Sequence, residues 1–168
     1  MSSDNLPSGE NQQERLDPMW LVGFTDGEGC FSLSIFKNKS MKFSYQIFPE
    51  FVLTQGAKSL ETLEKVQNFF GCGKIYENKR YDNHRESLYR YCVRNKADLL
   101  NIVCPFFDNY PLQTAKKYDF ELFKEGLAII EQKQHLKKEG FAALTNIASQ
   151  MNRQKSRILN DQTPKSVK

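Results

Sequence analysis

The sequence predicts an α+β fold in which one four-stranded antiparallel sheet carries helices on one face. Three observations favour it. The chain has 168 residues, a length typical of one domain. Its segments follow the order helix, strand, strand twice over, with further helices at the C-terminal end. Its predicted strands alternate apolar and polar residues, which is typical of strands buried on one side. We therefore expect an αββαββα core whose sheet has one covered and one open face.

Polar segments are expected at both ends of this core. Residues 1–16 and 161–168 contain no run of core-forming residues, and we expect flexible tails there. The residues between these tails, 17–160, are expected to form a single domain.

The first helix is predicted from its start signal. Asp17 is a good N-cap and Pro18 suits the first helical position. The apolar run 19–24 follows, and the helix is expected to end in the glycine-rich segment 26–29. Gly23 and Gly27 are four residues apart and share one helix face. Two helices can approach closely where such small residues face each other.

Two strands are expected next. Residues 30–37 alternate strictly, so one face takes Phe31, Leu33 and Ile35. The opposite, outward face takes Ser32, Ser34 and Phe36. After a turn at 38–40, residues 42–54 predict a longer strand, in which Pro49 indicates an edge position or a bulge. Its outward side chains are expected to be Lys42, Ser44, Gln46 and Phe48, and its inward ones Phe43, Tyr45 and Ile47.

The remaining elements follow from the same signals. Apolar residues at helical spacing predict a helix over 59–70 that Gly71 ends. Short strands are expected over 74–78 and 88–94, joined by a polar hairpin loop over 79–87. A short helix over 97–107 should break at Pro105. A long helix over 112–135 should turn Tyr118 inward, and after an interruption at Gly140 a last helix should span 141–160.

The net charge of +4 is too small to identify a partner by itself. Its distribution is more informative, since by residue counts segment 1–29 is acidic and segment 30–96, which holds the predicted strands, carries the basic excess. A positive open sheet face is therefore expected. No apolar run could span a bilayer and no signal peptide is evident, so we expect an intracellular protein without a membrane partner.

The four cysteines and two histidines are scattered along the chain. No CxxC pair or other close ligand spacing indicates a structural zinc site. Isolated cysteines in such a chain are expected to be reduced thiols.

The end of the first helix suggests a cation site. Glu28 is expected just beyond the helix C-terminus, where an anion is unfavourable beside the free carbonyl groups. A divalent cation such as Mg²⁺, which prefers oxygen ligands, would relieve this conflict. The alternative is an ordinary helix end with solvated acids, and spacing alone leaves both open.

The segment LVGFTDGEG at residues 21–29 resembles the signature of the LAGLIDADG homing endonucleases, in which a helix of this kind ends in Asp or Glu. GCGKIY at 71–76, the strand with Tyr89, Arg90 and Tyr91, and PLQTAKKYDFELFKE at 111–125 are similar to the family in the same order. The resemblance covers about residues 17–160 and implies a saddle-like sheet.

The resemblance implies a site-specific DNA endonuclease encoded in a mobile intron or intein. A single copy of the signature implies a homodimer, since one copy supplies one essential carboxylate and two strands must be cut. It further implies Mg²⁺-dependent hydrolysis across the minor groove of a long, nearly palindromic target, leaving 3′ overhangs, with Mn²⁺ or Ca²⁺ able to substitute in binding.

Candidate site residues follow from the resemblance. Glu28 and the carbonyl group of Gly27 would bind the metal, although Glu28 stands where many members have Asp. Gln55 would orient water near the metal, or else simply cap a strand end. Lys116 or Lys117 would approach the scissile phosphate, and a solvated helix lysine is the alternative. Asp26 is expected to be structural. The dimer interface would hold Trp20, Gly23, Phe24 and Gly27.

The outward face of the predicted sheet suits DNA, because a two-stranded ribbon fits the major groove. Base or phosphate contacts are expected from Ser32, Ser34, Phe36, Lys42, Ser44, Gln46, Lys74, Tyr76, Asn78 and Arg90. Phosphate contacts in loops are expected from Lys37, Asn38, Lys39, Lys79, Arg80 and Arg85. For each of these residues the alternative is a solvated surface position.

Two other functions use the same fold. One is an intron-splicing maturase that binds intron RNA, and the other is a DNA-binding protein without catalysis. The retained Glu28, Gln55 and lysines favour the nuclease. Neither the target sequence nor the compartment, whether organelle or cytoplasm, follows from the residues.

Overall fold

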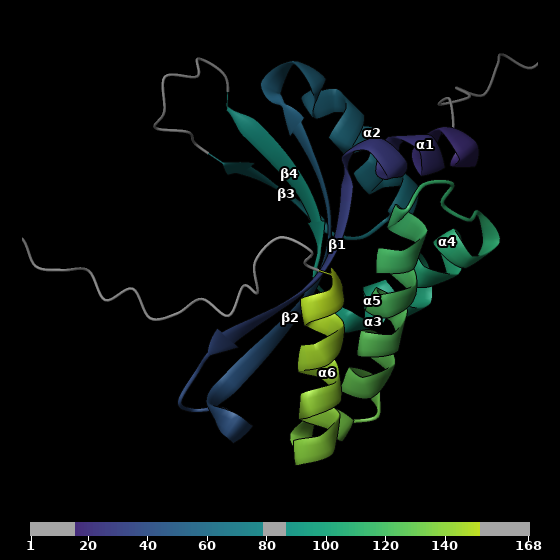
Figure 1. The fold of residues 1–168 in the computed structure, drawn as a ribbon. Coiled ribbons are helices and arrows are strands. Elements are labelled where there is room, and N and C mark those ends of the chain that lie inside the picture. The colour runs from purple at the N-terminus through teal and green to yellow at the C-terminus, as the bar shows by residue number, and fades with distance from the viewer. Residues whose placement is uncertain (1–15, 79–86, 152–168) are drawn as a thin grey trace, which may run out of the picture.

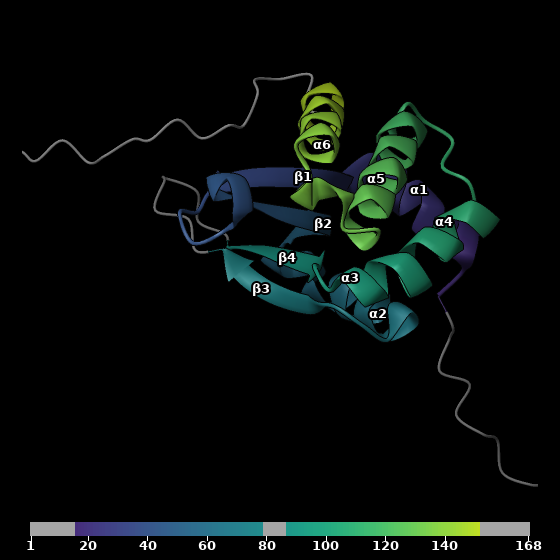
Figure 2. The same ribbon diagram turned by 90° about the horizontal axis from the view of Figure 1, so that it is seen from below.

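A computed structural model describes residues 16–78 and 87–151 and confirms the predicted architecture (Figure 1). Four strands form one antiparallel sheet in the order β1-β2-β4-β3. The helices gather on one side of this sheet, as Figure 2 shows from below. Within the described residues, no helix is long and apolar enough to cross a membrane.

Helix α1 spans Pro18–Glu28 and begins as predicted. The Asp17 side chain accepts hydrogen bonds from the backbone N–H groups of Met19 and Trp20, at 2.6 and 3.2 Å. The expectation that Glu28 lies beyond the helix was wrong by one residue. Glu28 is the last helical residue, because the N–H group of Gly29 still donates to the Thr25 carbonyl group and closes the final turn.

Strands β1 (Gly29–Lys37) and β2 (Tyr45–Gly56) form the first hairpin. The predicted alternation on β1 is confirmed, since Phe31, Leu33 and Ile35 are buried and the side chains between them are more exposed. The prediction that the second strand begins at Lys42 was wrong. Residues 42–44 form a 3₁₀ turn in which Phe43 and Ser44 have φ values of 60° and 58°, and this left-handed backbone cannot continue an extended strand.

Strand β4 (Leu88–Val93) pairs with the C-terminal half of β2, from Phe51 to Gly56, and β3 (Lys74–Asn78) pairs with the other edge of β4. Pro49 therefore lies where, among the described strands, β1 alone is paired with β2, which agrees with the predicted local edge. This stagger lets the two hairpins diverge toward opposite ends of the sheet, giving a saddle (Figure 1).

Helix α2 (Leu60–Phe70) ends at Gly71, whose φ of 65° suits glycine. The next helical stretch comprises α3 (Lys96–Asp98), a π-helical turn over Leu99–Val103, and α4 (Cys104–Asn109). The prediction that Pro105 breaks this helix was wrong. The wider π turn, in which the N–H group of Cys104 donates to the Leu99 carbonyl group, places the proline in the first turn of α4, where its missing donor is tolerated.

Helices α5 (Lys116–Glu131) and α6 (Lys138–Met151) complete the described chain. The prediction of a helix from Leu112 was wrong, because residues 111–115 cross to α1 in a non-helical segment. Tyr118 is 60% exposed instead of inward, and the buried face of α5 consists of Phe120, Phe123, Gly126 and Leu127. Gly140 lies inside α6 instead of interrupting it. Residues 152–160 of the predicted last helix lie outside the described chain.

Aromatic rings join the sheet to the helices. The Phe31 ring of β1 lies 5.0 Å from the Phe51 ring of β2, 5.5 Å from Phe107 of α4, and 5.2 Å from Phe120 of α5. All four side chains are buried. This packing fixes the start of β1, and with it the end of α1, against α5. None of the four cysteines, all of which lie in the described residues, forms a disulfide bond, which agrees with the prediction from their isolated positions.

Candidate functional site

One face of α1 is open and largely apolar. Leu21, Val22 and Thr25 point into the protein and are buried. On the opposite side Trp20 is 44% exposed and stacks on the half-buried Phe24, with ring centroids 4.9 Å apart. Gly23 and Gly27 are exposed on the same side.

The glycines make this face flat. A Cβ atom added to Gly23 or Gly27 would meet no described atom within 4 Å outside the chain neighbours and the backbone of its own helix. Neither glycine is needed for packing within the described chain, and each costs helix stability relative to alanine. Glycine at both positions therefore suits close approach of a second helix.

The C-terminal end of α1 meets the N-terminal end of α5. The Asp26 carboxylate accepts hydrogen bonds from the backbone N–H groups of Gln113 and Thr114, at 2.8 and 3.2 Å, and from the Thr114 hydroxyl group at 2.7 Å. Thr114 in turn accepts from the N–H group of Lys116, the first residue of α5. Asp26 therefore has the structural contacts that its place in the sequence predicted.

Removing the Asp26 carboxylate should loosen this junction. We expect Asp26→Ala to lower the free energy of unfolding by about 2 kcal/mol, because two backbone donors and one hydroxyl group lose a charged acceptor. Urea denaturation followed by circular dichroism measures the loss. Thr114→Val, which removes one of the three donors, should cost about a third as much. Equal stability of Asp26→Ala and the wild type would contradict the assignment.

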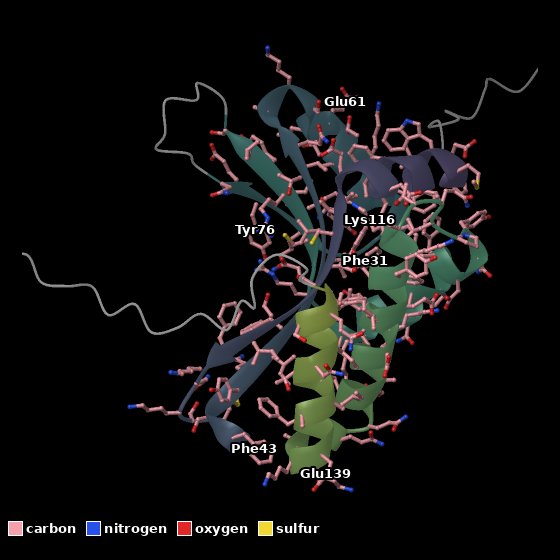
Figure 3. The ribbon with its side chains drawn as sticks, viewed as in Figure 1. Phe31, Phe43, Glu61, Tyr76, Lys116 and Glu139 are labelled. Atoms are coloured by element: carbon pink, nitrogen blue, oxygen red, sulfur yellow. The ribbon has the colours of Figure 1, made fainter. Side chains whose placement is uncertain are left out.

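Of the two candidate lysines, Lys116 reaches the end of α1. Its ammonium group donates to the Gly29 carbonyl group, one residue after Glu28, and Figure 3 places it at the junction of α1 and β1. Lys117 is exposed, and its ammonium group lies 5.1 Å from the centroid of the Tyr118 ring. The structure therefore places Lys116 at the helix end that carries Glu28, and Lys117 over the ring of Tyr118.

Gln55 lies at the same end of the sheet. Its strand neighbour Leu53 is opposite Gly29, so Gln55 is two residues further toward the end of α1. By alternation it shares the helix-covered face with Leu53, and it is half-buried opposite Tyr89. The prediction that Gln55 accompanies Glu28 is therefore compatible with the geometry.

The residues at this end suit a divalent cation. The Glu28 side chain is exposed, and the helix ends there, so the Gly27 carbonyl group has no donor within the helix. Carboxylate and carbonyl oxygens are ligands that Mg²⁺ accepts. No group of three His, Cys, Asp or Glu residues that could hold a metal occurs among the described residues. The remaining ligands would have to be water, phosphate or a second protein chain.

The outward face of the sheet carries most of the predicted DNA-contacting residues. Ser32, Ser34 and Phe36 of β1 lie opposite Glu50, Phe48 and Gln46 of β2 in the register. Phe36 and Phe48 are 36% and 38% exposed and pack edge to face, and the Asn38 amide group donates to Gln46 at 2.9 Å. The outward positions on the other hairpin are those of Lys74, Tyr76, Asn78 and Arg90.

The other predicted contacts fall into three groups. Ser44 was wrongly assigned to the outward row, because it lies in the 3₁₀ turn before β2. Lys37 and Lys39 are exposed at the end of the first hairpin. The side chain of Lys42, and Lys79, Arg80 and Arg85 altogether, lie outside what the structure describes.

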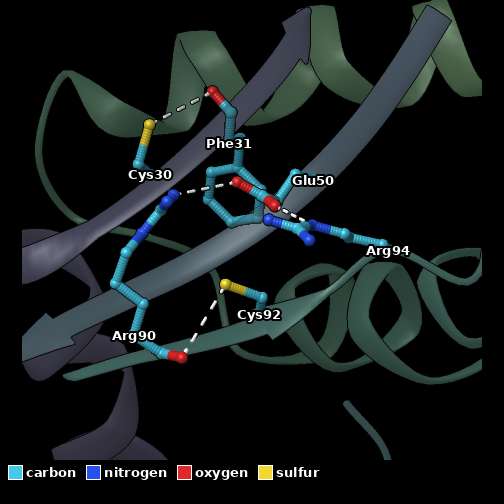
Figure 4. A network of polar contacts seen from close by, with 6 residues as sticks. All are labelled: Cys30, Phe31, Glu50, Arg90, Cys92 and Arg94. Atoms are coloured by element: carbon cyan, nitrogen blue, oxygen red, sulfur yellow. Dashed lines mark hydrogen bonds and ion pairs between the residues drawn. The ribbon is translucent and has the colours of Figure 1, made fainter. Parts of the chain in front are cut away.

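The sequence alone did not identify two charged residues on this face, Glu50 and Arg94. Glu50 accepts hydrogen bonds from Arg90 at 3.0 Å and from Arg94, as Figure 4 shows. The bond to Glu50 raises the pKa of Arg94, and burial raises the pKa of the neighbouring Cys92 thiol. Continuing the alternation from Gln46 and Phe48 would have placed Glu50 on the outward face.

Comparison with known proteins gives concordant matches. The family model described as LAGLIDADG endonuclease matches residues 21–127. The chain is 32% identical over 143 residues to probable intron-encoded endonuclease 3 of Neurospora crassa, a match that covers 84% of this chain and 26% of that protein. The chain spans about a quarter of the length of that protein and of two other curated relatives.

Two solved structures share the fold. The crystal structure of the homing endonuclease I-TnaI matches with a TM-score of 0.76 and 37% identity, over 84% of this chain and 91% of that chain. The structure of I-SmaMI bound to an uncleaved DNA target with calcium ions matches with a TM-score of 0.74 and 34% identity, over 82% of this chain and 45% of that chain.

Proposed function

The chain belongs to the LAGLIDADG endonuclease family, and from that premise we propose that it is a site-specific endonuclease that cleaves double-stranded DNA as a homodimer. The observation that carries the proposal is the end of α1, where the exposed Glu28 is followed by Gly29, whose carbonyl group accepts a hydrogen bond from the Lys116 ammonium group, beside an open helix face. A relative of similar fold, I-SmaMI, is bound to a DNA target.

The proposed homodimer rests on the acidic end of helix α1. One chain supplies one Glu28, whereas cutting two strands needs two such carboxylates near one axis. The face with Trp20, Gly23 and Gly27 is available for a second copy, and the match covers 45% of the I-SmaMI chain. Pairing through α1 would bring the two Glu28 residues together and join the two sheets into one long surface. The DNA target that would match two identical chains is nearly palindromic.

The proposed reaction is hydrolysis of a phosphodiester bond in each strand. Mg²⁺ held by Glu28 and the Gly27 carbonyl group would activate water and stabilise the leaving 3′ oxygen. The Lys116 ammonium group would stabilise negative charge that develops on the phosphate. Gln55 would orient a water molecule through its amide group. Cleavage across the minor groove, leaving 3′ overhangs, is part of this proposal.

The two lysines provide a test within one helical turn. We expect Lys116→Met to lower the cleavage rate about a hundredfold, because a positioned charge near the reacting phosphate is lost. Lys117→Met, which removes the same charge one residue away, should stay within about twofold of the wild type. Single-turnover cleavage with saturating protein measures both rates. The reverse order of effects would assign the role to Lys117.

A nicking assay tests the proposal as a whole. Purified chain is incubated with a plasmid library of randomised inserts in 10 mM Mg²⁺, in Ca²⁺, and in EDTA, and the cut products are sequenced. We expect cleavage of a recurrent, nearly palindromic site with Mg²⁺ and none with EDTA. Duplex binding without cleavage would favour a DNA-binding protein. Absence of both, with promotion of intron RNA splicing, would favour a maturase.

A further inference from the structure

The outward face of the sheet contains one charge of the wrong sign for DNA. Among the outward strand positions that the structure describes, only Glu50 carries an acidic side chain. A carboxylate on a surface that meets phosphates should weaken binding by repulsion. We propose that Glu50 is a specificity-determining positioning residue that holds Arg90 and Arg94 for the reading of guanine. The proposal rests on the DNA-binding function proposed above.

Glu50 holds each arginine with a different oxygen atom. Its Oε1 accepts from Nη2 of Arg90 at 3.0 Å, and its Oε2 accepts from Nε of Arg94. The Glu50 side chain is 14% exposed, whereas those of Arg90 and Arg94 are 37% and 49% exposed. The Glu50 side chain is therefore less accessible than those of the two arginines, which remain partly open to a ligand. Figure 4 shows both guanidinium groups directed at the carboxylate.

The strand register explains how both arginines reach one carboxylate. Phe51 is opposite Val93, so Arg94, the next residue, continues toward the level of Glu50. Arg90 is opposite Thr54, and its side chain must run along the sheet past Val52 and Cys92 to reach Glu50.

The outward residues between Arg90 and Glu50 are buried. Val52 and Cys92 are 4% and 3% exposed although they lie on the outward face, as expected if the stem of Arg90 passes over them. The guanidinium carbon of Arg94 lies 5.3 Å from the centroid of the Tyr76 ring. Arg94 is therefore restrained by the carboxylate and by the Tyr76 ring, and Arg90 by the carboxylate.

The restrained arginines keep donors for a base. A guanidinium group has five N–H donors, and Arg94 uses its Nε for Glu50, which leaves both terminal nitrogens. Two adjacent N–H groups match the O6 and N7 acceptors of guanine in the major groove. Holding the side chain in advance lowers the entropy lost on binding. Glu50 would thus reduce general attraction to phosphates and increase discrimination between bases.

The experiment compares base preference with salt dependence. The full chain, Glu50→Gln, Arg90→Met/Arg94→Met and the triple variant are each used to select bound duplexes from a randomised library, and affinity for the unselected library is measured at several salt concentrations. Glu61→Gln is the matched control. It removes the same charge from an exposed ion pair with Lys65, 2.9 Å long, on helix α2.

We expect Glu50→Gln to lower the preference for guanine about tenfold, at the same base positions where the double arginine variant loses that preference. Its affinity for the unselected library should depend more steeply on salt, by about one unit in log K against log salt for each chain. The triple variant should show no further change in preference relative to the double variant. Glu61→Gln should retain the wild-type preference and salt slope.

Two results would overturn the assignment. Unchanged base preference in Glu50→Gln, with a lowered melting temperature, would show that the ion pairs only stabilise the sheet. An effect of Glu50→Gln that persists without the arginines would show that it does not act through them. Should Glu50→Gln fail to fold, Glu50→Asp takes its place, because its shorter side chain should release one arginine. Failure of the wild type to bind duplex DNA would instead overturn the proposed function itself.

Discussion

Glu28→Gln should abolish DNA cleavage while leaving DNA binding intact. The substitution keeps the shape of the side chain at the end of α1 but removes the negative charge that would hold a divalent cation. Mutation of a group that only supports a metal ligand lowers metal affinity or activity by about 10–100-fold. Loss of the ligand itself should therefore lower the cleavage rate by more than about 100-fold. Single-turnover cleavage at 10 mM Mg²⁺ measures the rate.

Binding provides the second measurement for this variant. Glu28 makes no direct attraction to phosphates, and the basic groups along the sheet are unchanged, so affinity for the selected site in Ca²⁺ should stay within about threefold of the wild type. Because Glu28 is exposed, the melting temperature should also be unchanged. Glu64→Gln, an exposed acid on α2, is the matched control for charge. Parallel loss of binding and cleavage would show that Glu28 is structural.

Gly23→Leu should separate the stability of the chain from its association. No described atom outside the chain neighbours and the backbone of α1 lies within 4 Å of a Cβ at this position, so we expect room for a larger side chain in the single chain. Leucine also favours a helix over glycine by about 0.8 kcal/mol. We therefore expect the variant to be folded and slightly more stable. In a pair that meets through this face, however, the added side chain would hold the helices apart.

The expected outcome is a monomer that no longer cuts both strands. Sedimentation velocity at micromolar concentration measures the mass, and cleavage of the selected site measures activity, which should fall at least about 100-fold. Ala143→Leu adds bulk to an exposed position on α6 and should change neither property. A Gly23→Leu chain that remains dimeric and active would exclude this face of α1 from the interface.

Much of the candidate site could be predicted because its signals are local. The N-cap at Asp17, the glycine pair of α1 and the alternation of β1 each depend on a few neighbouring residues. Such patterns identify the acidic helix end and the outward row of β1. The same local patterns placed Tyr118 wrongly on the buried side. Several faces of α5 carry large side chains, and only packing against the sheet determines which face is buried.

The sequence by itself determined the order of the helices and strands, the apolar face of β1, and that the first helix ends within residues 26–29. The tertiary structure alone decided which distant groups meet. Asp26 bonds to Thr114 across 88 residues, and Glu50 bonds to Arg90 across 40. It also selected Lys116 over Lys117 for the end of α1. The physical reason is that local periodicity fixes side-chain direction within one element, whereas contacts between elements depend on strand order and register.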